Sequence, residues 1–431
     1  MNVSQLGDTI REDIFKTLQD VAFSLKQFNE HRNEEVMVKS LLRSISPFTV
    51  RGQFHRIAKG GARLTKYKFS YCISNDMDSN ASANPRMDFE VLPNSNPPSN
   101  VHVMIGRNGS GKTKMLQSMI NSLITGDSRW VQADEQAEKM NKKRAKFANV
   151  VCIAFSPFDN FSIDEKIKTS IPWYYIGLNK YSGDLLQDIK EQFYSAFSNC
   201  MLIAWKRRLW LESIELLKSD PLFADEEINS FADGMDSIEN DDSIEKRKDS
   251  ILKVFSRLSS GHKLVLLIIT GCVDKIEEQS IILFDEPENH LHPPLISALI
   301  RALSNLLSDR NGVAIIATHS PVVLQEVPSS CVWVLNRFGQ LLKVERPSVQ
   351  TFGASIGSLT REVFGLEVTK SGFHNLLYEM VKKLEDEKDS TRSKEIFDDY
   401  EYVASQFHDQ LGNEAETLLR TLIALQKKEV H

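Results

Sequence analysis

The sequence predicts an α/β fold with a parallel sheet at its centre, on the basis of three observations. A glycine-rich stretch, residues 106–113, lies between an apolar run that is typical of a strand and a run that is typical of a helix. Two further short apolar runs, at 281–284 and 313–317, have the length and composition of buried parallel strands. Between these two groups, from about 126 to 250, most apolar and aromatic residues recur at helical spacing.

The bulk composition is that of an ordinary globular protein. The chain has 431 residues, enough for two or three domains or lobes, with 41% apolar and 26% charged residues. A net charge of −6 argues against a general positive coat for nucleic acid, although a local basic patch stays open. Five scattered cysteines without a CxxC pair fit buried thiols in a reducing cytoplasm. With no signal-peptide pattern and no apolar run of membrane-spanning length, we expect a cytoplasmic protein without membrane contact.

The patterns along the chain divide it into five predicted parts. Apolar residues at helical spacing begin the chain, and a strand-like pattern follows from about 47 to 73. The run at 150–158 is predicted to be a buried strand that returns to the core, and 374–389 and 396–428 are predicted to be helical. The five parts are an N-terminal helical segment (1–46), a first lobe of the sheet domain (47–125), a helical insertion (126–250), a second lobe (251–345) and a helical C-terminal region (346–431).

The glycine-rich stretch GRNGSGKT fits the P-loop pattern G-x-x-x-x-G-K-[ST] in its strand–loop–helix context. Gly109 and Gly111 would let the backbone curl so that its N–H groups face a β-phosphate. Lys112 would reach the β- and γ-phosphates, and Thr113 would bind Mg²⁺. A plain turn before a helix cap is disfavoured, because every fixed position of the pattern is present. The predicted phosphate-binding residues are Gly106, Arg107, Asn108, Gly109, Ser110, Gly111, Lys112 and Thr113.

Polar residues also follow the two later strands. In SIILFDEPENHLHP, residues 280–293, Asp285 would bind Mg²⁺ through water, and Glu286 would act as the general base on the attacking water. In AIIATHSP, residues 314–321, His319 would hydrogen-bond a γ-phosphate. Either motif alone is also explained as the polar end of a strand. Behind a P-loop and on successive strands, we expect both to be catalytic.

The stretch RLSSGHKLVLL, residues 257–267, predicts a helix with an anion-binding N-terminus. Ser259, Ser260 and Gly261 are poor residues for a helix interior, but they start helices well and leave backbone N–H groups free. Such a terminus attracts anions. A plain cap on the same helix explains the stretch as well, and both roles can hold at once.

The order of the motifs, P-loop, LSSGH, DEP and THS, resembles the ABC-type ATPase fold in its Rad50, RecF and OLD branch. The resemblance implies an ABC-type P-loop ATPase head with a helical insertion and a helical C-terminal region, which binds and hydrolyses ATP with Mg²⁺. It also implies that Ser259, Ser260 and Gly261 face the ATP held by a second subunit. The protein would then be a homodimer or a higher homo-oligomer.

Two further stretches narrow the resemblance. ENHLHP looks like the E-x-x-L-H-P of OLD-type and related defence ATPases, which would put Asn289 and His290 at the dimer interface. No Toprim nuclease pattern follows His319. The tail FGASIGSLTREVFGLEVTKSGFHNLL, the closing LGNEAETLLRTLIAL and WYYIGL at 173–178 are similar to PtuA, the ATPase of Septu defence systems and of some retrons. This similarity implies a PtuB-like HNH nuclease as partner and, in a retron, a reverse transcriptase with its RNA–DNA hybrid.

Two assignments stay open at the level of sequence. Where many ABC proteins have a metal-binding glutamine, this chain reads FSPFDNF, so that Ser156 or Asp159 would have to substitute. Without a substitute, hydrolysis would be slow and ATP would act mainly as a clamp of the dimer. Tyr67 or Phe69 would stack on the adenine, although a place in the core explains both residues equally well.

Three functions compete on this basis. The first is a nucleotide-gated regulator of a partner nuclease in phage defence, which the DEPENHLHP loop and the tail favour. The second is a RecF-like ATPase of DNA repair, in which the basic clusters at 141–147 and 205–210 would contact DNA; solvated helix faces explain these clusters as well. The third, a scaffold with a degenerate site, is disfavoured by the intact P-loop and acidic pair.

Overall fold

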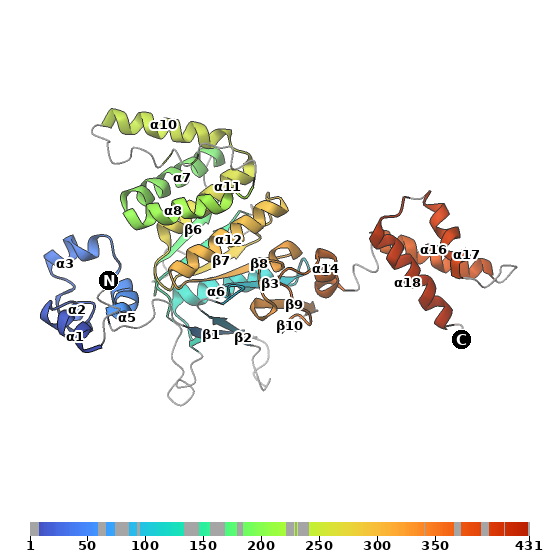
Figure 1. The fold of residues 1–431 in the computed structure, drawn as a ribbon, viewed down its shortest axis with the longest axis horizontal. Coiled ribbons are helices and arrows are strands. Elements are labelled where there is room, and N and C mark those ends of the chain that lie inside the picture. The colour runs from blue at the N-terminus through green and yellow to red at the C-terminus, as the bar shows by residue number, and fades with distance from the viewer. Residues whose placement is uncertain are drawn as a thin grey trace. The chain divides into compact units, whose positions relative to one another are not determined.

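In the computed structural model, the chain consists of two units, Met1–Ala354 and Ser355–His431 (Figure 1). No helix among its described residues is long and apolar enough to cross a membrane. The described residues are 8–58, 66–73, 86–92, 95–132, 146–155, 169–178, 184–220, 228, 231, 241–339, 341–365, 372–388, 396–408 and 410–429.

A seven-stranded sheet forms the centre of the first unit. Its strand order is β10-β9-β3-β8-β7-β5-β6, and every neighbouring pair is parallel except the last strand in sequence, β10, on β9. The predicted parallel strands are confirmed, and they are buried along their whole length because both faces of the sheet are covered. The strands are β3 (Val101–Gly106), β5 (Val150–Ala154), β6 (Trp173–Gly177), β7 (Ile281–Asp285), β8 (Val313–Thr318), β9 (Val332–Phe338) and β10 (Leu341–Glu345).

Helices cover this sheet and present their N-termini to its carboxyl edge. α6 (Lys112–Thr125) follows β3 directly and packs against β5, β7 and β8. α11 (Ser260–Lys275) and α12 (Pro293–Asp309) pack against other strands of the sheet. Because parallel strands end at one edge, the polar residues that follow β3, β7 and β8 are brought together there. Short helices α13 (Pro321–Leu324) and η6 (Ser329–Cys331) complete the connection from β8 to β9.

A smaller antiparallel sheet, in the order β2-β1-β4, packs its aromatic side chains into the same core as α6. Phe69 is enclosed there and stacks on Phe89, with the ring centroids 5.1 Å apart. The Tyr67 hydroxyl donates a hydrogen bond to the Asn311 carbonyl, just before β8 begins and therefore at the edge opposite the P-loop. Tyr67 and Phe69 were predicted either to stack on adenine or to lie in the core. They pack in the core, and the predicted adenine contact is wrong for both. The strands are β1 (Tyr67–Cys72), β2 (Arg86–Val91) and β4 (Trp130–Gln132).

The N-terminal segment is helical well beyond residue 46. The strand-like pattern predicted from 47 is wrong for 47–58, because Ser46 accepts a hydrogen bond from the Thr49 N–H at 3.1 Å and Pro47 takes the first helical position. The β-branched Val50 is buried in a small helical core instead of a sheet. The helices are α1 (Asp8–Thr17), α2 (Leu25–His31), α3 (Glu35–Lys39), η2 (Leu41–Arg43), α4 (Pro47–Thr49), η3 (Val50–Phe54) and α5 (His55–Ala58).

Three long helices form the lobe between β6 and α11: α7 (Leu185–Leu202), α8 (Ala204–Leu217) and α10 (Asp241–Arg257). Phe193, Phe197 and Phe255 stack in its interior, with the Phe193 and Phe255 centroids 4.4 Å apart. The segment predicted as a helical insertion, 126–250, also supplies β4, β5 and β6 to the two sheets before α7 begins.

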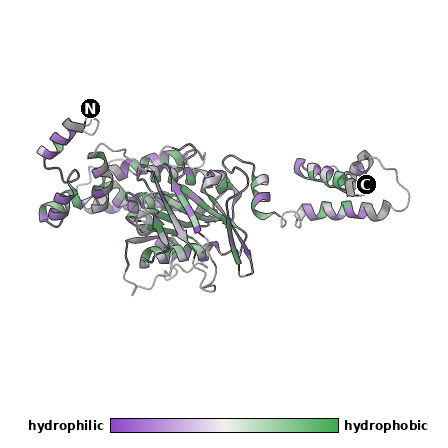
Figure 2. Cartoon of the chain, turned by 90° about the horizontal axis from the view of Figure 1, so that it is seen from below, coloured by the Kyte–Doolittle hydropathy of each residue, from purple (hydrophilic) through white to green (hydrophobic). Residues whose placement is uncertain are grey.

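The second unit is helical, as its sequence predicts. Leu377, Val381, Val403, Leu419 and Ile423 form a core shared by three helices, and Figure 2 shows hydrophilic and hydrophobic residues mixed along these helices. The helices predicted at 374–389 and 396–428 are confirmed, the second of them as two separate helices. The helices are α14 (Ile356–Phe364), α16 (Gly372–Lys388), α17 (Ile396–Gln406) and α18 (Asn413–Glu429).

Candidate nucleotide site

The loop between β3 and α6 has the backbone of a phosphate cradle. Gly109 and Gly111 have φ of +80° and +94°, in the left-handed region that residues with a Cβ enter only at a cost. Such a turn directs consecutive N–H groups into the loop, and the N-terminus of α6 adds the positive end of a helix dipole. Gly111 is also the N-cap of α6 and makes no side-chain capping bond. The N–H groups at this terminus are therefore arranged in a way that suits an anion.

Lys112 lies inside this loop. Its Nζ donates to the carbonyls of Gly106 and Arg107, at 2.9 and 3.1 Å, and the residue is only 5% exposed. Burial lowers the pKa of Lys112, while the carboxylates of Glu286, Glu288 and Asp285 act in the opposite direction. The three carboxylates at and after the end of β7 therefore act electrostatically on this ammonium. Of the residues between β3 and α6, Arg107 is half-buried, Asn108 and Gly109 are exposed, and Ser110 is buried. Thr113 is half-buried on the first turn of α6.

The pairing of β3 with β9 places a cation, Arg337, beside the P-loop, and the sequence analysis did not predict it. Gly106 lies opposite Leu335, and a Cβ on Gly106 would collide with the Leu335 carbonyl oxygen. Two residues further along β9, Arg337 is exposed, and its Nη1 lies 3.3 Å from the place that a Cβ on Gly111 would take. The guanidinium thus lies beside the P-loop. Only the pairing of two strands distant in sequence could have revealed it.

The acidic pair begins at the end of β7. Asp285 is 2% exposed and pairs in register with Ala154 and Ala317 of the neighbouring strands. The Glu286 N–H donates to the Ala317 carbonyl at 2.8 Å, and Glu286 has φ of +47°, a conformation that is strained for a residue with a Cβ. Its Oε2 accepts a hydrogen bond from Asn289 at 3.1 Å. His319 holds the pKa of Glu286 below its usual range, so that this carboxylate is ionised at neutral pH.

A second glutamate, Glu288, was also missed by sequence reasoning, and it contacts His319. Its Oε1 accepts hydrogen bonds from the Thr318 hydroxyl and the His319 N–H, both at 2.7 Å, and lies 3.0 Å from His319 Nδ1. Glu286 and Glu288 together raise the pKa of His319 to about 10. His319 is therefore an imidazolium at neutral pH, while 41% of its side chain is exposed at the sheet edge.

The predicted anion-binding helix begins where expected, and its first residues form a cap. Ser259 is the N-cap of α11: its Oγ accepts from the His262 N–H at 3.3 Å and lies 2.7 Å from His262 Nδ1. Ser260 is exposed and Gly261 is buried. A Cβ on Gly261 would lie 3.0 Å from the His290 carbonyl oxygen. The start of α11 thus packs on the turn that follows the acidic pair, and the capping role of Ser259 is confirmed.

A buried carboxylate lies behind this contact. Asp220, after α8, is 3% exposed, and His292 Nε2 is 3.0 Å from its Oδ2. His262 Nε2 is 3.9 Å from the other oxygen of the same carboxylate. Asp220 therefore joins the first turn of α11 to the segment before α12.

The predicted dimer-interface residues lie in the turn between β7 and α12. Asn289 is half-buried against Glu286, whereas His290 is exposed and has φ of +69°. Ser156 and Asp159, the predicted substitutes for the metal-binding glutamine, lie outside the described residues.

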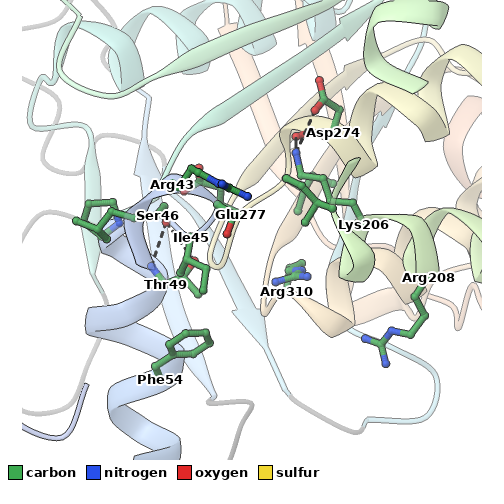
Figure 3. Close-up of a pocket in the computed structure, with 15 residues that line it drawn as sticks. Arg43, Ile45, Ser46, Thr49, Phe54, Lys206, Arg208, Asp274, Glu277 and Arg310 are labelled. Atoms are coloured by element: carbon green, nitrogen blue, oxygen red, sulfur yellow. Dashed lines mark hydrogen bonds and ion pairs between the residues drawn. The ribbon is translucent and has the colours of Figure 1, made fainter. Parts of the chain in front are cut away.

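The basic cluster at 205–210 is largely engaged within the protein. Lys206 forms an ion pair with Asp274 at 3.0 Å, and Arg207 donates to a backbone carbonyl near the end of α7 at 2.8 Å. Arg208 is the more exposed of these cations, and Figure 3 shows it at the side of a hollow. Of the other cluster, only residues 146 and 147 are described, and Phe147 is in the core. The hollow has a volume of about 620 Å³, and its cationic lining residues are Arg43, Lys206, Arg208 and Arg310.

The chain is similar in sequence to several known proteins. Residues 160–325 match the family model "AAA domain, putative AbiEii toxin, Type IV TA system". Protein ea59 of Escherichia phage lambda is 39% identical over 440 residues, which cover 98% of this chain and 81% of ea59. Septu protein PtuA of Bacillus thuringiensis is 26% identical over 39% of this chain and 46% of its own length. The retron Vc95 probable ATPase of Vibrio cholerae serotype O1 biovar El Tor is 26% identical over 25% of this chain and 22% of its own. The similarity to PtuA inferred from the sequence is therefore a distant one.

Proposed function

The chain belongs to the family of protein ea59 of phage lambda, and we propose that it is an ATPase that pairs with a second copy of itself around ATP. One observation carries the proposal. The P-loop, the acidic pair after β7 and His319 after β8 come together at the carboxyl edge of one parallel sheet. The match of 160–325 to an AAA-domain family supports the same class of activity.

In this proposal each group has one task. The N–H groups of the P-loop and Lys112 bind the β- and γ-phosphates. Glu286, ionised at neutral pH, accepts a proton from the attacking water, and the His319 imidazolium stabilises negative charge on the γ-phosphate.

Magnesium fits the oxygen donors at this edge. Asp285 is a buried carboxylate at the end of β7, Thr113 offers a hydroxyl on the first turn of α6, and α6 packs on β7. When bound, Mg²⁺ would neutralise phosphate charge. The two residues are proposed as its holders, Asp285 acting through water.

Pairing of two copies follows from the start of α11. Ser259 and Ser260 are exposed at the N-terminus of a 16-residue helix, and the Ser259 hydroxyl caps that helix. The Ser260 hydroxyl and the first backbone N–H groups of the helix suit the γ-phosphate of an ATP bound by another copy. The resemblance to ABC-type ATPases implies this arrangement. A homodimer, or a larger homo-oligomer, is therefore part of the proposal.

The distant similarity to the Septu and retron ATPases suggests a role in phage defence. We propose that the nucleotide state of the pair controls a PtuB-like HNH nuclease, in a retron setting together with a reverse transcriptase and its RNA–DNA hybrid. The RecF-like alternative gains little from the structure, since Lys206 and Arg207 are already bonded within the chain.

The nucleotide site is tested by Lys112→Ala. Loss of an ammonium that binds charged oxygens costs about 3 kcal/mol, or about 100-fold in the Kd of ATP. Calorimetric titration with Mg·ATP measures the change. Lys114→Ala, an exposed position in the same helix, is the matched control and should bind like the wild type. Equal affinity of Lys112→Ala and the control would refute the site.

A further inference from the structure

We propose that Glu288 is a positioning residue, which fixes the backbone and ring of His319 so that the ring faces the γ-phosphate. The inference rests on the proposed function, because it assigns a role within the same ATPase site. It concerns a residue outside the acidic pair, at the start of the turn that leads to α12.

Glu288 has the geometry of an anchor. Its side chain is 8% exposed, and a single oxygen, Oε1, lies within 3.0 Å of the Thr318 hydroxyl, the His319 N–H and His319 Nδ1. Burial opposes ionisation of Glu288, but hydrogen bonds from His319 and Thr318 lower its pKa, so the carboxylate is charged. Glu288 thus contacts the Thr318 hydroxyl, the His319 backbone N–H and the His319 ring at the same time. Glu288 therefore fixes the end of β8 as well as the imidazole.

The neighbouring glutamate is placed differently. Glu286 Oε1 is 3.7 Å from His319 Nδ1, beyond hydrogen-bonding distance, whereas the Glu288 oxygen is 3.0 Å away. The other carboxylate oxygen of Glu286, Oε2, accepts a hydrogen bond from the Asn289 side chain. The two carboxylates thus divide the work: Glu288 holds the ring, and Glu286 keeps an oxygen for water.

The contact with Glu288 also decides which ring nitrogen meets the nucleotide. His319 Nδ1 lies 3.0 Å from the Glu288 carboxylate, which favours a proton on that nitrogen, so a neutral ring would present a lone pair at Nε2, and a lone pair repels a phosphate oxygen. An imidazolium presents an N–H there instead. Among the described residues, Glu286 and Glu288 are the charged groups that act on the ring, and both carboxylates also act electrostatically on the Lys112 ammonium. The two glutamates keep His319 protonated and thus a donor at both nitrogens.

The first test is the pH dependence of ATP hydrolysis by the full chain with Glu288→Gln. Glutamine keeps the shape but loses the charge, so kcat should fall by about 10- to 100-fold, with KM little changed because the P-loop still binds the phosphates. In the wild type the imidazolium persists to about pH 10. In the variant the pKa of His319 is lower. As the pH is raised, the variant should therefore lose activity at a lower pH than the wild type does. Glu288→Asp keeps the negative charge and should therefore restore part of the activity at alkaline pH.

The second test does not depend on hydrolysis. The chain has ten histidines, so a spectrum of histidine-labelled protein can be resolved, with His319→Gln to assign the signal. NMR titration should give a raised pKa and a protonated Nδ1 for His319 in the wild type, and a lower pKa in Glu288→Gln. An unchanged pKa and tautomer in a folded Glu288→Gln would overturn the proposal. A wild type without ATPase activity would instead refute the proposed function, while the histidine signal would still decide the contact.

Discussion

Two turns at the carboxyl edge of the sheet, the P-loop after β3 and the turn after β7, both contain left-handed backbone, but they place different residue types there. The P-loop enters the left-handed region at Gly109 and Gly111, where no Cβ is strained. The turn after β7 enters it at Glu286 and His290, both of which carry side chains. The difference reflects what each turn supplies. In the proposed function, the P-loop binds phosphate through bare backbone N–H groups, whereas Glu286 must bring its carboxylate to one fixed position, and the strained backbone places it there.

The acidic turn is tested most strongly by Glu286→Gln. The amide cannot accept the proton of water, so the rate of hydrolysis should fall by about 10²- to 10⁴-fold. Binding of ATP should persist, because the P-loop is unchanged, and the protein should accumulate in its ATP state. Steady-state phosphate release and a filter-binding assay separate the two effects. Normal turnover in this variant would show that another group is the base.

Smaller effects on stability and ATP binding are expected when glycine is replaced by a residue with a Cβ in the P-loop, or the reverse is done in the turn after β7. Gly111→Ala puts a Cβ at φ of +94° and 3.3 Å from Arg337, which should cost about 1–2 kcal/mol of stability and weaken ATP binding. His290→Gly relieves the strain at φ of +69°, but glycine gains freedom in the unfolded chain, so the net gain should be at most about 1 kcal/mol. Urea unfolding of both variants gives the comparison. A tolerated Gly111→Ala would mean that the cradle does not need bare backbone.

Much of this edge is predictable from the sequence, because each motif carries its own strand or helix. The P-loop, Asp285 and His319 follow apolar runs that form adjacent parallel strands, so the topology alone brings them to one edge. Glu288 was not predicted, since its role depends on β7 and β8 being neighbours and on contacts with residues some thirty positions away. Arg337 was missed for the same reason, as β9 reaches the P-loop only by pairing with β3.

The regions where prediction failed lack such motifs. A strand-like pattern was predicted from about 47, but 47–58 is helical, and Val50 is buried in a small helical core. Tyr67 and Phe69 were candidates for stacking on adenine because they are aromatic residues on the early strands, where a place in the core was an equally good explanation. Their strand instead turns them into the core and toward the opposite edge of the large sheet. Residue type alone did not give the direction in which these side chains point.

The central claim is that ATP joins two copies through the start of α11. The direct measurement is the mass in solution, by analytical ultracentrifugation, of Glu286→Gln with and without Mg·ATP. The account predicts that ATP raises the mass to at least that of a pair, and that adding Ser260→Trp at the exposed start of α11 prevents this without loss of ATP binding. Asn305→Trp, at an exposed position of α12, is the control and should pair normally. A mass that ATP leaves unchanged, or pairing that survives Ser260→Trp, would contradict the account.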